Sequence, residues 1–531
     1  MNSNGSIEDS SSVNFGFRNI HFDRENGFFL NGKSVKIKGV CLHHDAGALG
    51  AVVNVRAIER QLQILKDMGC NAIRTSHNAP APELLDLCDK MGFLVMDEVF
   101  DMWAKKKNKF DYHLDFPQWH KQDLQDQILR DRNHPSVFMW SIGNEIREQF
   151  DSSGTRLTKE LVRLTKEIDT SRPITSALTE MDTTKNFIYQ AKDLDVLGWN
   201  YNEKMYSDFL KKYPGQKFIA SETVSALESR GHYDTPGDTT MFWPSNSKEK
   251  YVVNGNKDFT VSAYDDVAAY WGSSHETTWK IIKKYPFLSG TFVWTGFDYL
   301  GEPTPYPFPA RSSYFGIVDL AGFPKDVYYM YQSEWSDKNV LHLLPHWNWK
   351  PGKIVNVWAY YNNADEVELY LNGKSLGVRK KQGDDLHVTW KVPFESGTLK
   401  AISRRDGKTV LTKEIKTAGK PAKILLSADR DNISSNSNDL SYVTVQVVDK
   451  DGNIVPNADN EISFSITGTG SIAGTDNGYQ ADTTSLKRPI RKAFNGKCLV
   501  IIQSNNKQGT ILLKATSPHL NTTTITINSK K

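Results

Sequence analysis

Between residues 33 and 338 the chain alternates short β-rich runs of apolar residues with segments in which apolar residues recur at helical spacing. The β-rich runs are residues 35–42, 71–77, 93–98, 137–145, 174–178, 196–201, 217–222 and 290–294. Helical patterns between them cover residues 57–68, 82–91 and 155–168. This rhythm is typical of parallel β/α units. Eight such runs predict a (β/α)8 barrel over residues 33–338.

After residue 338 the helical periodicity stops and apolar and polar residues alternate. Residues 367–371 alternate in this way and run into Asn372-Gly373, a dipeptide typical of a tight β-hairpin turn. A second set of alternating runs begins near Ala422. Each set has the length of an immunoglobulin-like β-sandwich, so two such domains are predicted, over residues 339–419 and 420–531. The predicted fold class is therefore multidomain, α/β plus all-β.

Composition and charge restrict the partners that the chain is expected to bind. The formal net charge of +3 with 24% charged residues predicts no basic face, which argues against nucleic acid or a membrane as partner. The formation of a homo-oligomer stays open.

No apolar run has transmembrane length, and residues 1–13 are polar rather than typical of a signal peptide. The sequence does not determine the compartment of the protein. A periplasmic or extracellular location of a full-length form stays open.

Two of the β-rich runs end in a carboxylate. Residues 140–145 read Trp-Ser-Ile-Gly-Asn-Glu and end at Glu145, and residues 219–222 read Ile-Ala-Ser-Glu and end at Glu222. Catalytic residues of (β/α)8 barrels come from the C-terminal ends of strands, and these residues close the fourth and seventh runs. A single glutamate at a strand end is as readily a salt-bridge partner. Two of them on these strands predict chemistry by paired carboxylates.

Paired carboxyl groups suit the hydrolysis of a glycosidic bond. In a retaining glycosidase a neutral carboxyl protonates the leaving oxygen while an ionised one attacks the anomeric carbon. Two acids about 5 Å apart favour this division, because the charge on one raises the pKa of the other. We expect Glu145 to be the acid/base and Glu222 the nucleophile, with Asn144 bound to the sugar 2-hydroxyl.

Several motifs run in order through the predicted barrel. They are residues 39–45 (Gly-Val-Cys-Leu-His-His-Asp), 74–77 (Arg-Thr-Ser-His), 97–98 (Asp-Glu), 143–145 (Gly-Asn-Glu), 221–222 (Ser-Glu) and 292–299 (Phe-Val-Trp-Thr-Gly-Phe-Asp-Tyr). Together they resemble glycoside hydrolase family 2. Residues 301–306, 316–326 and 344–349 resemble its multidomain bacterial β-galactosidases, which carry further immunoglobulin-like domains.

The resemblance implies roles for further residues. It implies that Glu145 is the acid/base and Glu222 the nucleophile, that Arg74 orients the nucleophile and that Tyr201 contacts it. It also implies a sugar pocket lined by His43, Asp45, His77, Asn144 and Asn200, with Trp294 as its floor. From the residues alone, the histidines are as readily packing residues, Arg74 an ion-pair partner and Trp294 a core residue.

The sequence departs from the family pattern at two places. Family members begin with a jelly-roll domain and an immunoglobulin-like domain, and residues 1–32 are expected to hold only a remnant of the second. Magnesium-using relatives place an acidic residue and a histidine as ligands where this chain has Asp101-Met102-Trp103, with no histidine nearby. No required metal and no other cofactor are therefore predicted.

The predicted substrate sugar rests on a sequence element that β-glucuronidases of the family carry. β-Glucuronidases of the family hold the substrate carboxylate through an Asn-x-Lys element after strand eight, and no such element occurs between Tyr299 and Trp335. The predicted function is therefore a retaining exo-β-galactosidase that acts on β-galactosides or related oligosaccharides. β-Mannosidase or β-glucuronidase activity stays open. An alternative to an enzyme also stays open, namely a non-catalytic fragment that binds carbohydrate.

Overall fold

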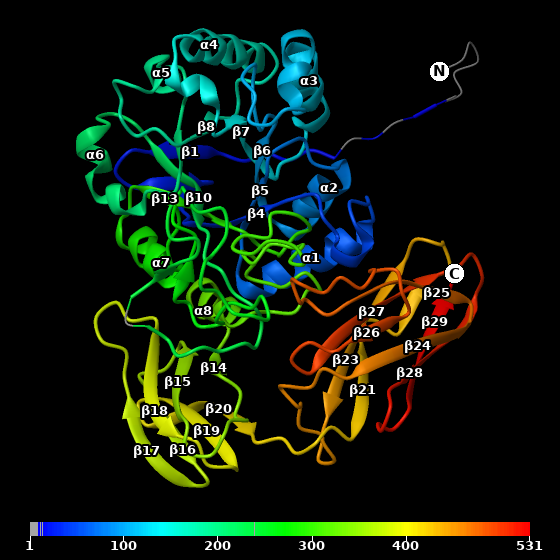
Figure 1. Ribbon diagram of the computed structural model, residues 1–531. Coiled ribbons are helices and arrows are strands. Elements are labelled where there is room, and N and C mark those ends of the chain that lie inside the picture. The colour runs from blue at the N-terminus through cyan, green and yellow to red at the C-terminus, as the bar shows by residue number, and fades with distance from the viewer. Residues whose placement is uncertain (1–8, 11, 13, 238) are drawn as a thin grey trace. The chain divides into compact units, whose positions relative to one another are not determined.

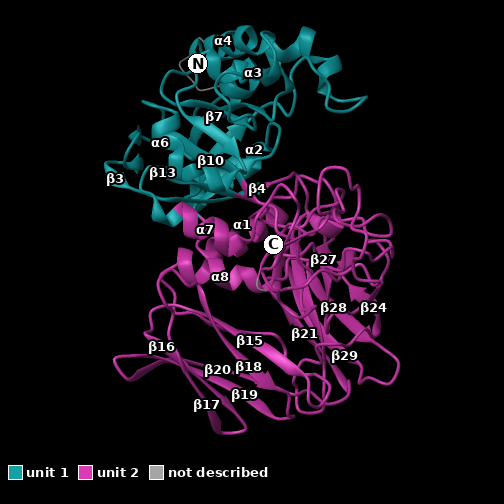
Figure 2. Ribbon diagram, turned by 60° about the vertical axis from the view of Figure 1, so that its left-hand side comes forward, with its two compact units in different colours: residues 1–41, 71–222, 283–292 teal, residues 42–70, 223–282, 293–531 magenta. Residues whose placement is uncertain are grey.

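The computed structural model (Figure 1) describes residues 9–10, 12, 14–237 and 239–531. The chain forms two compact units, each assembled from several stretches of sequence (Figure 2). The first unit comprises residues 1–41, 71–222 and 283–292, and the second comprises residues 42–70, 223–282 and 293–531. Among the described residues, no helix combines the length and the apolar character needed to span a membrane.

Eight strands close into a barrel, with parallel pairing from β5 through to β10 (Figure 1). In chain order the strands are β4 (Ile37–Leu42), β5 (Ala72–Thr75), β6 (Leu94–Glu98), β7 (Val137–Asn144), β8 (Ile174–Leu178), β9 (Leu197–Asn200), β10 (Phe218–Val224) and β13 (Leu288–Trp294). All eight residues of β7 are buried, as expected for a parallel strand that is covered on both faces. The predicted (β/α)8 barrel is thus confirmed.

The helices include those that the apolar periodicity predicts. They are α1 (Val55–Met68), α2 (Pro82–Met91), α3 (Phe116–Asp131), α4 (Ser153–Lys166), α5 (Phe187–Gln190), α6 (Phe209–Lys212), α7 (His275–Lys284) and α8 (Asp326–Trp335). Short 3-10 turns are η1 (Gly47–Leu49), η2 (Tyr112–Leu114), η3 (Arg147–Phe150) and η4 (Glu203–Asp208). The side chain of Asn54 caps the start of α1, and Gly69 ends this helix at a φ of 98°, a conformation that favours glycine.

Small sheets occur outside the barrel. β1 (Ile20–Asp23), β2 (Gly27–Leu30) and β3 (Lys33–Ser34) form a three-stranded sheet, and β11 (Met241–Phe242) pairs with β12 (Val267–Ala268). The predicted remnant of an immunoglobulin-like domain, residues 1–32, contains β1 and β2, whereas its residues 1–8, 11 and 13 lie outside the described residues. Its assignment as a domain stays a prediction.

Two β-sandwiches follow within the second unit. The first joins a sheet of order β14-β15-β18 to one of order β17-β16-β19-β20. Its strands are β14 (Leu341–Leu344), β15 (Ile354–Tyr361), β16 (Glu366–Leu371), β17 (Lys374–Arg379), β18 (His387–Pro393), β19 (Thr398–Arg405) and β20 (Lys408–Lys416). One apolar core fills the space between the sheets, with Trp347, Val357, Leu369 and Leu399 fully buried. The predicted hairpin is confirmed, since Asn372 and Gly373 have φ values of 52° and 83° between β16 and β17.

The second sandwich joins a sheet of order β21-β23-β27-β25 to one of order β22-β29-β28-β24-β26. Its strands are β21 (Lys423–Ala428), β22 (Asn432–Ser434), β23 (Leu440–Val448), β24 (Glu461–Gly468), β25 (Gly470–Asp476), β26 (Ile490–Lys492), β27 (Lys497–Ser504), β28 (Gly509–Thr516) and β29 (Thr523–Lys530). Alternate residues of these strands form its core, among them Val445, Val500 and Leu513. The predicted boundaries of the four domains stay predictions.

Candidate active site

The two predicted catalytic carboxylates belong to the first unit and close two strands of the barrel. Glu145 directly follows β7, the fourth barrel strand in chain order, and Glu222 lies near the end of β10, the seventh. Backbone bonds fix both, because Glu145 N donates to Ala177 O (2.8 Å) and Tyr201 N donates to Glu222 O (2.7 Å). Since the C-terminal ends of parallel strands meet at one end of a barrel, the two carboxylates are brought to the same end.

Glu222 accepts hydrogen bonds from two strong donors. The Arg74 guanidinium donates through Nη1 to Oε2 at 2.7 Å, and the Tyr201 hydroxyl donates to Oε1 at 2.6 Å. His77 Nε2 lies 3.8 Å from Oε2. Charge-assisted bonds of this length stabilise an ionised carboxylate. Glu222 is therefore held in position with its charge paired.

A second carboxylate, Glu98, anchors Arg74 from the other side. Both residues are fully buried, and Arg74 Nη2 lies 2.9 Å from Glu98 Oε1. Glu98 also contacts His77 Nδ1 (2.8 Å) and accepts from Ser141 Oγ (2.7 Å). Burial alone would raise the pKa of Glu98, but the Arg74 guanidinium and the His77 ring hold it below its ordinary value. The ionised Glu98 thereby fixes the guanidinium that faces Glu222.

Two amides connect Arg74 with Glu145. Asn144 Oδ1 accepts from Arg74 Nη2 (2.8 Å) and from Asn200 Nδ2 (3.1 Å). Asn200 Nδ2 also donates to Glu145 Oε1 at 3.0 Å, and its Oδ1 accepts from Ser221 Oγ at 2.8 Å. The hydroxyl of Ser221 therefore orients the Asn200 amide with its nitrogen toward Glu145. A continuous chain of contacts links the two predicted catalytic carboxylates.

The surroundings of Glu145 favour its neutral form. Burial and the charge of Glu222 raise the pKa of Glu145, while the bond from Asn200 and the nearby Lys107 ammonium oppose this rise. Glu145 and Tyr201 also have left-handed backbone conformations, with φ values of 45° and 57°. Such conformations cost energy in residues other than glycine and cluster at functional sites. Backbone strain and a raised pKa thus coincide at Glu145.

Asp101 lies beside this network but does not offer a magnesium site. Its Oδ1 accepts from Lys107 Nζ (2.7 Å) and from Asn144 Nδ2 (3.0 Å), and Lys107 also donates to the Asn144 carbonyl (3.0 Å). Burial would raise the pKa of Asp101, but His77 and Lys107 hold it below its ordinary value. Magnesium requires an octahedral shell of oxygen ligands. A carboxylate bound to a lysine ammonium does not fit that ion.

Three predicted sugar-binding residues, His43, Asp45 and Trp294, belong to the second unit. The His43 ring lies edge-on to Trp294 and Tyr299, with centroids 5.1 and 4.4 Å away. Asp45 accepts from the backbone N–H groups of Gly47 (2.6 Å) and Leu300 (2.9 Å), and burial raises its pKa despite these bonds. His43 and Trp294 are thus in contact. That these three residues line a sugar pocket stays a prediction.

A cavity of about 580 Å³ opens beside the network in the first unit. His77 and Asp101 form part of its lining, and the remainder includes the rings of Phe100 and Tyr112 and the side chain of Arg130. A concave surface with aromatic walls and a few convergent polar groups is typical of a small-molecule site. The cavity therefore extends from the charged network to an aromatic wall.

Three further residues of the network are not predicted by the sequence as site residues. Glu98 stands at the end of β6, and its place at a strand end was the available signal. Ser221 directly precedes Glu222 and orients Asn200 through its hydroxyl. Lys107 lies in the loop after β6, where no periodicity or motif marks it. The loop conformation alone brings its ammonium to Asp101.

The barrel, with paired carboxylates at the ends of its fourth and seventh strands, defines the class of (β/α)8-barrel glycoside hydrolases. The chain belongs to glycoside hydrolase family 2, since the model of this family's TIM barrel domain matches residues 23–302, more than half of the chain. The model of the family's C-terminal domain 5 matches residues 424–526. A domain of unknown function matches residues 352–411.

Curated proteins and solved structures of the family are similar to the chain over most of its length. It is 51% identical to the β-galactosidase BoGH2A of Bacteroides ovatus, over 97% of this chain and 64% of the relative. It is 28% identical to a β-glucuronidase of Bacteroides fragilis, over 78% of this chain and 58% of the relative. The crystal structure of a β-glycosidase from Bacteroides vulgatus superposes with a TM-score of 0.87 at 36% identity, covering 97% of this chain and 66% of that one. The chain thus spans less than two thirds of the length of each of these relatives, between 58% and 66%.

Proposed function

We propose that the chain is a retaining exo-β-glycosidase that hydrolyses terminal β-galactosyl residues. One observation carries the proposal. Glu222 accepts bonds from Arg74 and Tyr201, which stabilise a carboxylate anion, whereas burial and the charge of Glu222 raise the pKa of Glu145. An ionised and a neutral carboxyl at one barrel end are the pair that double displacement requires.

In the first half-reaction, Glu222 attacks the anomeric carbon while Glu145 gives its proton to the glycosidic oxygen. The bond between that carbon and the oxygen breaks, and the leaving group departs as an alcohol. A covalent ester joins Glu222 to the sugar, and Glu145 is left ionised. Arg74, held by Glu98, and Tyr201 orient Glu222 for this attack.

In the second half-reaction, a water molecule attacks the same carbon and gives its proton to Glu145. The ester bond breaks, Glu222 regains its charge and the sugar leaves with its anomeric configuration retained. Asn200, which donates to Glu145, positions this residue in both halves. Asn144, with its amide fixed by Arg74 and Asp101, is the residue that we assign to the sugar 2-hydroxyl. His77 completes the pocket beside Glu222.

The proposal that the substrate is a β-galactoside is supported by similarity to a relative and by the sequence. The relative with 51% identity is named a β-galactosidase, and no Asn-x-Lys element occurs between Tyr299 and Trp335. The aromatic pair His43 and Trp294, together with Asp45, is the further sugar-binding group that we propose. The cavity beside His77 would take the part of an oligosaccharide that lies beyond the scissile bond.

A β-glucuronide is the second candidate substrate. Asn202-Glu203-Lys204 has the Asn-x-Lys pattern and directly follows Tyr201, whose hydroxyl contacts Glu222. Asn202 and Lys204 are both exposed. A lysine near the sugar would pair with a substrate carboxylate that a galactoside lacks.

The test uses aryl glycosides. The chain is incubated with 4-nitrophenyl β-galactoside, β-glucuronide and β-mannoside, and the released nitrophenol is followed, with Glu222→Gln as the inactive control. We expect the kcat/KM for the galactoside to exceed the other two by at least about tenfold, a difference of roughly 1.4 kcal/mol. If the β-glucuronide had the highest kcat/KM, the substrate would be a glucuronide and not a galactoside. No release from any substrate, together with galactose binding by calorimetry, would overturn the enzyme and support a carbohydrate-binding protein.

A further inference from the structure

A buried group of ligating side chains lies in the second unit, in the segment between β10 and α7. It consists of Glu228, Asp265 and His275, and one ligand atom from each lies within 4.8 Å of the others. The three side chains are 1%, 9% and 1% exposed. Nothing in the proposed glycosidase mechanism uses them.

Glu228 is the unusual member of this group. Both of its carboxylate oxygens are buried, and neither has a hydrogen-bond partner among the described residues. An isolated carboxylate in the protein interior is costly unless a cation or several donors satisfy it. Glu228 comes within 4.8 Å of the ligand atoms of Asp265 and His275 without a hydrogen bond to either. The Glu228 carboxylate therefore lies close enough to Asp265 and His275 to share an ion with them.

Asp265 and His275 are held in position by hydrogen bonds. Asp265 accepts from the backbone N–H groups of His275 (2.8 Å) and Glu276 (2.7 Å), which holds its carboxylate at the start of α7. His275 Nδ1 contacts the Tyr331 hydroxyl at 2.9 Å, so we assign Nε2 as the nitrogen that would bind an ion. A second ring nitrogen bonded to a neighbouring group is the usual arrangement of a metal-binding histidine.

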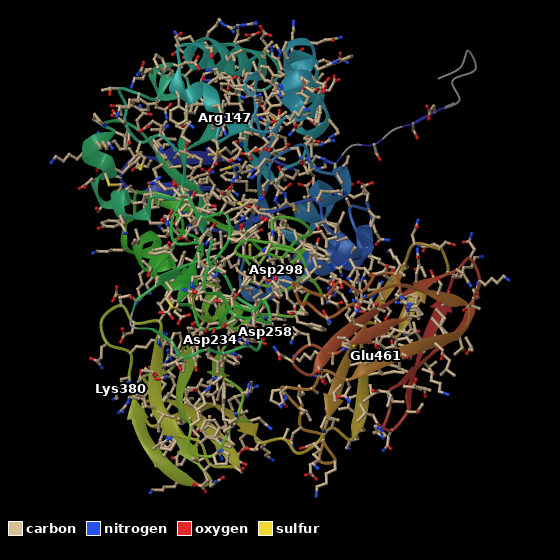
Figure 3. The ribbon with its side chains drawn as sticks, viewed as in Figure 1. Arg147, Asp234, Asp258, Asp298, Lys380 and Glu461 are labelled. Atoms are coloured by element: carbon tan, nitrogen blue, oxygen red, sulfur yellow. The ribbon has the colours of Figure 1, made fainter. Side chains whose placement is uncertain are left out.

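The neighbouring lysine does not satisfy Glu228. Lys325 Nζ lies 3.0 Å from Asp298, which is labelled in Figure 3, and donates to the Tyr314 carbonyl at 3.0 Å. Both Lys325 and Asp298 are fully or almost fully buried, and their side chains form an ion pair. An ionised Glu228 would therefore need a cation other than Lys325.

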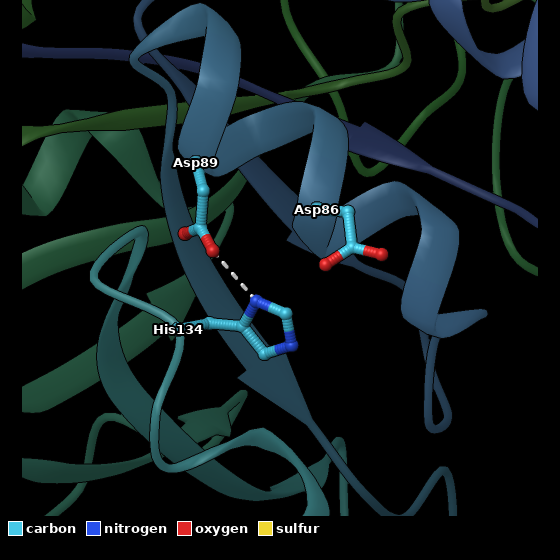
Figure 4. A group of neighbouring side chains, drawn as sticks. All are labelled: Asp86, Asp89 and His134. Carbon is cyan, nitrogen blue, oxygen red and sulfur yellow. Dashed lines mark hydrogen bonds and ion pairs between the residues drawn. The ribbon is translucent and has the colours of Figure 1, made fainter. Parts of the chain in front are cut away.

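A second group of ligating residues, Asp86, Asp89 and His134, makes the contrast clear (Figure 4). There Asp89 Oδ2 contacts His134 Nδ1 at 2.7 Å and Asp89 Oδ1 accepts from Ser136 N at 2.8 Å. Asp86 is exposed. These bonds satisfy Asp89, and Asp86 faces solvent, so the group gives no reason to infer a ligand.

We propose that Glu228, Asp265 and His275 bind a divalent transition-metal ion, with zinc as the best match. One imidazole and two carboxylates are ligands that zinc accepts at about 2.0–2.2 Å, so they would lie roughly 3–4 Å apart. The ion balances the buried charge of Glu228. It also joins the segment after β10 to the start of α7, so its role is structural. This site lies apart in sequence from Asp101, and the proposal does not depend on the glycosidase assignment.

The test begins with metal-free protein, prepared by dialysis against a chelator. One equivalent of Zn²⁺ is then added, the excess is removed, and the retained metal and the melting temperature are measured. We expect one retained ion per chain and a rise of roughly 3–5 °C. Glu228→Gln should retain none and show no rise, while Asp86→Asn, the matched control in the exposed group, should behave as the parent.

Cobalt gives a readout that depends on ligation rather than on stability. The metal-free chain with Co²⁺ should develop visible absorption bands that weaken or vanish in both Glu228→Gln and His275→Gln. Equal metal retention by the parent and Glu228→Gln would overturn the proposal, as would loss of metal in Asp86→Asn alone. An unchanged melting temperature with no retained zinc, combined with greater stability of Glu228→Gln, would also overturn it, because Glu228 would then carry a proton.

Discussion

Glu145 and Glu222 close two strands of the same barrel, yet their surroundings differ. Glu222 accepts from a guanidinium at 2.7 Å and from a phenolic hydroxyl at 2.6 Å. Glu145 accepts from the neutral amide of Asn200 at 3.0 Å. A charged donor stabilises an anion more than a neutral amide does, and burial favours the neutral form.

The two residues are both glutamates, so the roles that we propose for them rest on their neighbours and not on the type of side chain. Arg74 can support Glu222 because Glu98 holds it from the opposite side. Glu145 has no such cation directly bonded among the described contacts, and the charge of Glu222 raises its pKa. Substitutions around Glu222 and around Glu145 should therefore change the rate and its pH dependence in different ways.

The largest expected effect comes from removing the proposed nucleophile, Glu222. Glu222→Gln keeps the shape and the contact with Tyr201 but cannot form a stable ester, so kcat should fall by about 10⁴-fold or more. Turnover of an aryl β-galactoside is the measurement, with Glu25→Gln at an exposed position as the control. More than about 1% residual activity in Glu222→Gln would mean that Glu222 does not have this role.

Changing Glu145 should affect substrates unequally. Loss of the acid slows a galactoside with a poor leaving group by about 10²–10⁴-fold, but an activated aryl galactoside far less, because only the former needs the proton. In the parent, activity should fall as the pH rises through the raised pKa of Glu145. Glu145→Gln should lack this alkaline fall. Equal loss on both substrates would contradict the acid role.

Removing Glu98 tests whether Arg74 is anchored as described. Glu98→Gln leaves a buried guanidinium with one carboxylate fewer, which should cost about 3–5 kcal/mol of stability. The pKa of Glu98 is lowered in the folded chain, so its contribution is present above its unfolded pKa of about 4.3 and is lost as the pH falls through the folded value. Melting temperatures of parent and variant should therefore converge below about pH 4. A gap that widens in acid would contradict an ionised Glu98.

The smallest expected effect concerns Lys107. Its ammonium opposes the raised pKa of Glu145, so Lys107→Met should move the alkaline fall in activity to higher pH and change kcat/KM at pH 7 by no more than about fivefold. Lys105→Met is the matched control, because Lys105 pairs with Asp151 instead. The same shift in both variants would exclude a specific effect of Lys107 on Glu145.

The sequence predicts the barrel well because its strands carry a strong local signal. β7 and β10 are continuous apolar runs that end in polar residues, a pattern that follows from burial on both faces. The hairpin at Asn372-Gly373 is predicted for a similarly local reason, since only certain residues accept its positive φ values. The pairing of Glu145 with Glu222 follows from strand order alone.

The contacts within the site are less predictable. Lys107 reaches Asp101 through the course of a loop, which has no periodicity to mark it. Glu228 meets Asp265 and His275 only because a long irregular segment folds back on itself, and the missing partners of Glu228 have no sequence signal. Such features depend on tertiary structure, whereas strand and helix patterns depend on neighbouring residues.

The central claim, that Glu222 forms a covalent bond to the sugar, can be tested by trapping. A 2-deoxy-2-fluoro-β-galactosyl fluoride should label the chain once, because the fluorine destabilises the transition state and slows hydrolysis of the ester. We predict that mass spectrometry of the digested protein finds the sugar on the peptide that contains Glu222, with loss of activity in proportion and no label in Glu222→Gln. A label on another residue, or full turnover of an aryl galactoside with no label formed, would contradict the account.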